Sequence, residues 1–177
     1  ERIAHLPVLG VIPLVKPKKA DRNVALAMQS HLDARSTFAE AYRSVRTALQ
    51  FSTREGAPRQ LVVTSTAAQE GKSTTALALA INFAQAGQSV LLIDADLRNP
   101  SMHAMLDLDN TRGLSNYLSG DIPALGVVRI TPITEPSRSA MPQAQTAADI
   151  VHPRPWISVM NHGLWPSADV SQRMPQF

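Results

Sequence analysis

The spacing of apolar residues along the chain predicts two helices. Between residues 37 and 51, four apolar residues recur three or four positions apart, so a helix would place them on one face: Phe38, Tyr42, Val45 and Leu49. Thr37 and Glu40 fit the capping-box pattern at the start of this segment. Residues 72–86 are strong helix formers, and Gly87 follows them as a C-terminal cap.

Two short apolar runs flank the second predicted helix and predict strands. Residues 60–65 (QLVVTS) precede the helix and residues 89–94 (SVLLID) follow it. Strand, helix and strand in succession form a βαβ unit, which implies a parallel sheet with a right-handed crossover. Residues 8–15 predict an edge strand, because Pro13 interrupts the run. Two short helices are expected at residues 101–106 and 113–118.

The pattern changes near residue 126, where the chain becomes rich in proline and no periodicity lasts. We therefore expect three parts: residues 1–35 as an edge strand and basic linker, 36–125 as the folded region, and 126–177 as an irregular tail, disordered or foreign to the fold. Hydrophobic residues make up 44% of the 177 residues and charged residues 18%, which suits a packed core and excludes wholesale disorder. The absence of cysteine excludes a disulfide scaffold, a Cys-ligated zinc site and a thiol nucleophile.

Charge is unevenly distributed. The net charge is +3, and residues 1–60 carry ten Lys and Arg against five acidic residues. A basic first third suits nucleic acid, anionic lipid or an acidic partner, and it equally suits a solvated surface.

The sequence Gly71-Lys72-Ser73-Thr74 carries the most specific chemistry, because it lies between a predicted buried strand and a predicted helix. Backbone N–H groups at a helix start bind anions, Lys72 would neutralise phosphates, and the Ser73 hydroxyl would ligate Mg²⁺. The full P-loop pattern is not met, because its first glycine falls at Thr66. The predicted nucleotide-binding loop and helix start consist of Ala68, Gln69, Glu70, Gly71, Lys72, Ser73 and Thr74.

Acidic residues follow the second predicted strand in LLIDADLRNP. Asp94 and Asp96 come where a parallel strand ends, the edge at which open α/β sheets bind ligands. Both carboxylates suit a metal ion or the acceptance of a hydroxyl proton, and the sequence does not distinguish their roles. Arg98 suits a phosphate contact or a pair with an aspartate.

The order of these motifs resembles the bacterial tyrosine kinases of capsule and exopolysaccharide synthesis. GKST and LLIDADLRNP match the family's nucleotide motifs, and NTRGLSNYLSGD matches the stretch that follows them. VLGVIPLV is similar to the segment after the second membrane helix of fused members. Glu40, Arg43 and Arg46 match the family's E-x-x-R-x-x-R assembly motif.

The resemblance implies a P-loop NTPase-like parallel sheet with flanking helices, here incomplete. It implies ATP and Mg²⁺ as cofactors, with Lys72, Asp94 and Asp96 as catalytic residues and Ser73, Asp94 and Asp96 at the metal. It further implies phosphate transfer to tyrosines of a neighbouring subunit in a ring, and a membrane-embedded polysaccharide co-polymerase half, fused or separate. The expected location is cytoplasmic, at the inner face of the cell membrane, with no nucleic acid as partner.

Three departures from the family pattern shape the expectation for this chain. Ala68 and Gln69 stand where the family has Pro-Gly, no later apolar strand ends in Asp, and the tyrosine-rich tail is missing. These departures indicate a sequence truncated or altered after about residue 125, with little or no kinase activity.

Two alternatives remain open at this point. One is a partitioning or division-site ATPase, although such proteins carry a second loop lysine where this chain has Ala67. The other is a non-catalytic domain that oligomerises through Glu40, Arg43 and Arg46. A dinucleotide-binding domain is disfavoured, because the chain has no G-x-G-x-x-G.

Overall fold

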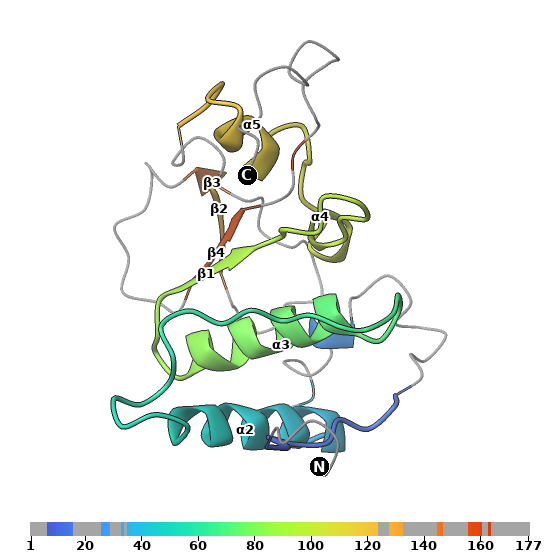
Figure 1. Ribbon diagram of the computed structural model, residues 1–177, viewed down its shortest axis with the longest axis vertical. Helices are drawn as coiled ribbons and strands as arrows, with labels where there is room; N and C mark the ends of the chain where they lie inside the picture. The colour runs from blue at the N-terminus through green and yellow to red at the C-terminus, as the bar shows by residue number, and fades with distance from the viewer. Residues whose placement is uncertain are drawn as a thin grey trace. The chain divides into compact units, whose positions relative to one another are not determined.

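The computed structural model describes residues 7–15, 26–28, 33, 35–123, 128–132, 145–146, 156–160 and 163. The chain divides into two compact units, Glu1–Phe83 and Ala84–Phe177. The first unit contains α2 and most of α3, and the second contains the sheet and two short helices (Figure 1).

Helices α2 (Thr37–Gln50) and α3 (Lys72–Gln85) confirm the two predicted helices and lie side by side (Figure 1). The apolar face of α2 is buried as the spacing predicts, and its buried residues are Phe38, Ala39, Tyr42, Val45 and Leu49. Gly87 ends α3 in the left-handed conformation, with φ of 84°, and its N–H group donates to the Ala84 carbonyl oxygen at 2.9 Å.

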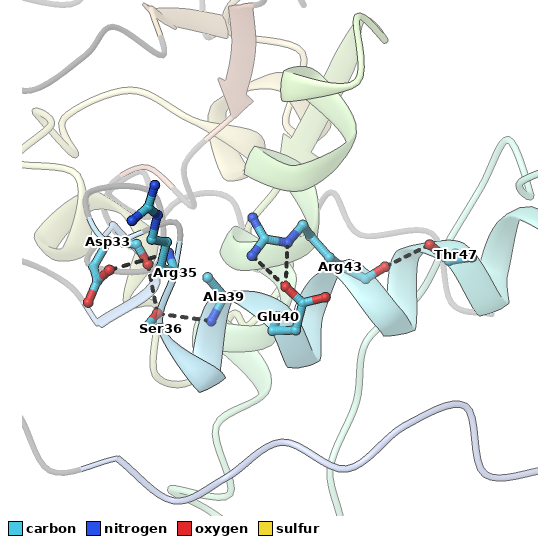
Figure 2. Close-up of polar contacts among 7 residues, drawn as sticks. All are labelled: Asp33, Arg35, Ser36, Ala39, Glu40, Arg43 and Thr47. Atoms are coloured by element: carbon cyan, nitrogen blue, oxygen red, sulfur yellow. Dashed lines mark hydrogen bonds and ion pairs between the residues drawn. The ribbon is translucent and has the colours of Figure 1, made fainter.

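The start of α2 differs by one residue from the predicted capping box. Ser36 is the N-cap: its hydroxyl oxygen accepts from the Ala39 N–H group at 3.2 Å and donates to the Asp33 carbonyl oxygen at 2.8 Å (Figure 2). Glu40 pairs instead with Arg43, one turn further along the helix. The Ser36 hydroxyl reaches a helix N–H group from an extended backbone, the geometry that a capping side chain requires.

Two predicted strands of the first unit are not formed among the described residues. Residues 7–15 and 60–65 have no ladder partner, and the side chain of Val62 is 88% exposed. A strand is defined by pairing with a neighbour, so an apolar run alone does not make one. The segment at 7–15 instead approaches α2 closely, since a Cβ atom on Gly10 would lie 2.5 Å from Val45 Cγ2.

The second unit holds a four-stranded sheet in the order β1-β4-β2-β3. β1 (Val90–Ile93) pairs in parallel with β4 (Trp156–Met160), with Val90 opposite Ile157. β2 (Val128–Pro132) runs antiparallel to β4 and to β3 (Gln145–Thr146). The α/β prediction is therefore confirmed and its parallel pairing is that of β1 with β4, while the sheet as a whole is mixed.

The strands β2, β3 and β4 all lie within residues 126–177, where the sequence predicted no regular element. Those three segments correct that expectation, and the other residues of that range, apart from Gly163, lie outside the described part of the chain. β4 is buried at Ile157, Val159 and Met160, so it belongs to the core. Its partner β1 lies more than 60 residues earlier in the sequence. The local pattern of apolar residues therefore did not predict β4, because this strand depends on a distant partner.

The short helices α4 (Met102–Met105) and α5 (Leu114–Leu118) confirm the last two predicted helices. Gly163, with φ of 79°, packs against the start of α5: a Cβ atom there would lie 2.4 Å from the Gly113 nitrogen. Its N–H group donates to Asn110 Oδ1 at 3.0 Å. A side chain at position 163 would therefore force the backbone at Gly113 to move.

Candidate nucleotide-binding site

The GKST sequence lies where the sequence analysis placed it, at the start of α3. Lys72 and Ser73 are its first two residues, and the Thr75 N–H group donates to the Gly71 carbonyl oxygen at 2.8 Å. Gly71 has φ of 88°, a conformation that glycine adopts without strain. The positive end of the helix dipole lies at this turn and favours an anion there.

The loop before α3 contains a second left-handed residue that is not glycine. Gln69 has φ of 64°, at one of the two positions that the sequence analysis identified as departures from the expected loop pattern. For a residue with a Cβ atom this conformation costs about 1–2 kcal/mol. The side chain of Gln69 is exposed, so the strain lies in the backbone.

Glu70 closes this loop on itself. Its carboxylate accepts from the backbone N–H groups of Thr66 at 2.9 Å and Ala67 at 3.1 Å, and from the Thr66 hydroxyl at 3.1 Å. The Ala67 N–H group and then the Thr66 hydroxyl hold the pKa of the Glu70 carboxyl below its ordinary value. Glu70, predicted only as one of the loop residues, is therefore the side chain that organises the loop.

Tyr42 anchors the first turn of α3 to α2. Its hydroxyl lies 3.0 Å from Thr75 Oγ1, and the tyrosine is 2% exposed. Burial raises the pKa of the Tyr42 phenol, and the hydrogen bond with Thr75 lowers it by less. The sequence showed Tyr42 only as part of an apolar stripe. Because a buried tyrosine hydroxyl needs a hydrogen-bond partner, a tyrosine within such a stripe is the sequence signal for a contact of this kind.

Asp94 follows β1 and is buried, with 5% of its surface exposed. Its N–H group donates to the Met160 carbonyl oxygen at 3.0 Å, so β4 fixes the residue's backbone. Asp94 Oδ2 accepts from the N–H groups of Ser101 and Met102, both at 2.9 Å, and Oδ1 accepts from Asp96 N–H at 3.2 Å. The carboxylate thus ties the strand end to the start of α4.

Asp96 has a more open environment than Asp94. It is half-buried, and its Oδ1 accepts from the N–H groups of Arg98 at 3.3 Å and Asn99 at 3.0 Å. Arg98 is exposed. The two aspartates, equivalent in the sequence, therefore differ in burial and in the span of chain that each one ties together.

The three residues of the assembly motif also differ from one another. Arg43 pairs with Glu40 at 2.6 Å on the exposed side of α2 (Figure 2). Arg46 instead donates from Nη1 to the Asn82 carbonyl oxygen of α3 at 3.1 Å, and its Nε is buried with no hydrogen-bond partner. Arg46 therefore has a role within the first unit that the motif did not indicate.

The site residues fall into two groups that belong to different compact units. Residues 66–75 of the first unit are held together by Glu70 and Tyr42, and residues 94–102 of the second unit are held together by Asp94. Taken separately, the Ser73 hydroxyl of the first unit and the Asp96 carboxylate of the second are oxygen donors of the kind that Mg²⁺ prefers, and Mg²⁺ usually keeps waters and substrate phosphates as further ligands. The donor types therefore fit the metal, although no group of three or more His, Cys, Asp or Glu able to hold one occurs among the described residues.

Among the residues that the structure describes, no helix has the length and apolarity to cross a membrane.

Residues 61–163 match the CobQ/CobB/MinD/ParA nucleotide binding domain. The chain belongs to this family. The match spans more than half of the chain and includes both the GKST helix and β4, so the family assignment covers the region beyond residue 125 as well as the predicted P-loop region.

The curated relatives are bacterial tyrosine-protein kinases, which confirms the resemblance inferred from the motifs. Tyrosine-protein kinase YwqD of Bacillus subtilis is 45% identical over 86 residues, covering 49% of this chain and 36% of the relative. Tyrosine-protein kinase CpsD of Streptococcus agalactiae is 47% identical over 83 residues, covering 46% and 35%. The chain thus spans little more than a third of the length of these relatives.

A solved structure shows the same fold. The BceF tyrosine kinase domain superposes with a TM-score of 0.64 at 26% identity, over 92% of this chain and 59% of that domain. The relatives named above are tyrosine-protein kinases, and this favours the kinase interpretation over the partitioning ATPase within the broader family.

Proposed function

We propose that this chain is the ATP-binding part of a bacterial protein-tyrosine autokinase that regulates capsule or exopolysaccharide polymerisation and export. The observation that carries the proposal is the placement of Gly71-Lys72-Ser73-Thr74 at the start of α3, in a chain whose relatives are tyrosine-protein kinases. The chain would supply nucleotide binding, and we expect its own catalytic activity to be low, because the family's third acidic motif and its tyrosine cluster are not found in this sequence.

The residues of α3 would bind the phosphates. Lys72 would neutralise their charge, and the N–H groups at the helix start, from Gly71 to Thr74, would bond their oxygens. Ser73 would hold Mg²⁺, which when bound supplies further neutralisation of phosphate charge. The Tyr42–Thr75 contact supports this assignment, because it fixes the helix turn that carries these groups.

The two aspartates would divide the remaining work. Asp94 accepts three backbone N–H groups in a buried site, so we assign it to shaping the loop, with any metal contact secondary. Asp96 is more accessible, and we assign it to the metal and to the proton of the attacking hydroxyl. Arg98, exposed in the same loop, would contact phosphate.

The possible acceptor tyrosines within this chain are two. Tyr42 is buried and Tyr117 is 44% exposed, so Tyr117 is the one that a kinase could reach without unfolding the domain.

Transfer to a neighbouring subunit would require self-association. Glu40 and Arg43, exposed on α2, are the side chains we propose for that contact, with Arg46 beside them. A membrane-embedded co-polymerase half would hold the domain at the inner face of the cell membrane.

Calorimetric titration with Mg–ATP tests the proposal. Lys72→Met should lower the affinity about ten- to a hundred-fold, because a charge-assisted phosphate contact is lost. Arg59→Met is the matched control, since it removes a positive charge from an exposed position of the same unit. Equal ATP affinities for the two folded variants would contradict the assignment of Lys72.

A further inference from the structure

The loop before α3 is held by side chains, and not only by its backbone. Glu70 reaches back to Thr66 and Ala67, as described above, and the Ser65 hydroxyl donates to the Ala67 carbonyl oxygen at 2.8 Å. These contacts join the start of the loop to the residue just before Gly71. They fix a turn in which every residue from 66 to 70 is exposed, so no core packing holds it.

The composition of the loop explains why such contacts matter. Thr66 stands where the P-loop pattern has its first glycine, and Gln69 takes a left-handed conformation that glycine would take without strain. A loop that holds one residue, Gln69, in an unfavourable backbone conformation needs an interaction that opposes its relaxation. The carboxylate of Glu70, which accepts three donors from two residues, is that interaction.

We propose that Glu70 is a positioning residue of the nucleotide loop: its carboxylate holds the first two amides of the loop and so presets the curvature that phosphate binding requires. This inference rests on the proposed function, in which the start of α3, to which this loop leads, binds the phosphates of ATP. Glu70 touches no reacting atom and acts through the loop backbone.

A different role for the same carboxylate would be competition, with Glu70 occupying the phosphate position until a nucleotide displaces it. The contacts argue against that role. The carboxylate bonds Thr66 and Ala67 at the start of the loop, whereas the helix start that favours an anion begins at Gly71. The two roles predict opposite effects on affinity when the carboxylate is removed.

Calorimetric titration of the full chain with Mg–ATP separates these roles. Glu70→Ala should weaken binding about three- to ten-fold, which is less than the roughly ten- to hundred-fold effect of losing a hydrogen bond to a charged group, because this carboxylate is exposed. Glu70→Gln should recover most of the affinity, since its side-chain oxygen still accepts an N–H group. Glu55→Ala is the matched control, because Glu55 is an exposed glutamate of the same unit outside the loop, and it should bind like wild type.

A second measurement follows the loop without nucleotide. In amide NMR spectra, the Thr66 and Ala67 signals should shift in Glu70→Ala and stay unchanged in Glu55→Ala, while thermal stability changes little in both. Glu70→Ala binding as well as wild type, or unshifted amides, would overturn the positioning role, and tighter binding would establish competition instead. If the wild-type chain itself does not bind Mg–ATP, the proposed function and this inference both fail. If the wild-type chain binds and Glu70→Ala binds equally well, only the inference about Glu70 fails.

Discussion

The loop that leads into α3 and the loop that follows β1 are both held by a carboxylate that accepts backbone N–H groups, but in opposite surroundings. Glu70 is fully exposed and bonds residues three and four positions away. Asp94 is buried and bonds residues up to eight positions away, while its own N–H group continues the pairing of β1 with β4. The first carboxylate shapes a local turn, and the second is part of the core of its unit.

This difference matters for how each loop responds to change. A buried carboxylate leaves several N–H groups without an acceptor when it is removed, and water cannot readily replace it. An exposed carboxylate is replaced by water at little cost to the stability of the fold. Substitutions in the loop after β1 should therefore act on stability first, and substitutions in the loop before α3 should act on ligand binding first.

The largest effect is expected at Asp94. Asp94→Ala leaves three N–H groups without their acceptor, that of Met102 buried and those of Asp96 and Ser101 partly buried, and should lower the free energy of unfolding by about 2–4 kcal/mol. Asp96→Ala, the control two residues away, should cost less than about 1 kcal/mol, because Asp96 is more accessible to water. Urea unfolding followed by circular dichroism measures both. Similar losses for the two variants would remove the contrast between the aspartates.

A similar contrast between a buried contact and an exposed one occurs within α2, at Arg46 and Arg43. Arg46→Ala removes the contact with the Asn82 carbonyl oxygen and buried packing, and should lower the free energy of unfolding by about 1–2 kcal/mol. Arg43→Ala breaks an exposed pair with Glu40 worth about 0.2–0.5 kcal/mol. Sedimentation should show the reverse order, with Arg43→Ala reducing self-association more. An Arg46→Ala variant as stable as Arg43→Ala would show that the contact between α2 and α3 contributes nothing.

The elements that could be predicted from the sequence are those specified by local patterns. The apolar stripe of α2, the helix formers of α3 and the position of Gly87 depend on neighbours within a few turns, and all three are confirmed. The N-cap at Ser36 lay one residue from the predicted position, because Ser36 and Thr37 are both acceptable caps and only the backbone decides between them.

Features that depend on distant partners could not be predicted. β4 needs β1 beside it, and residues 60–65, although apolar, have no ladder partner among the described residues. Asp94 and Asp96 look alike in the sequence, since their difference arises from the return of the chain to Ser101 and Met102. The sequence did identify Ala68 and Gln69 as departures from the kinase pattern, and the positive φ of Gln69 gives that departure a physical cost.

Gln69→Gly tests that cost. Relief of the left-handed strain, about 1–2 kcal/mol, exceeds the entropy that a glycine adds to the unfolded chain, so a net gain of about 0.5–1 kcal/mol is expected. Ala68→Gly is the control, because Ala68 does not have a positive φ and the same entropy loss is then uncompensated. Differential scanning calorimetry compares the two variants. If Gln69→Gly were destabilising, the stabilisation contributed by the Gln69 side chain would exceed the strain of its left-handed backbone.

The smallest effect, and the most local, concerns the protonation of Glu70. The pKa of its carboxyl is lowered in the folded chain, so its contacts are present above the ordinary glutamate pKa and are lost as the pH falls through the lowered value. The Ala67 amide proton should therefore shift with a midpoint below that of a free glutamate, and the titration should be missing in Glu70→Gln. Because the group is fully exposed, global stability should not follow the same curve. NMR titration of the wild-type chain and of Glu70→Gln measures the midpoint, and a midpoint at the ordinary glutamate value would show that the carboxylate spends little time on the loop amides.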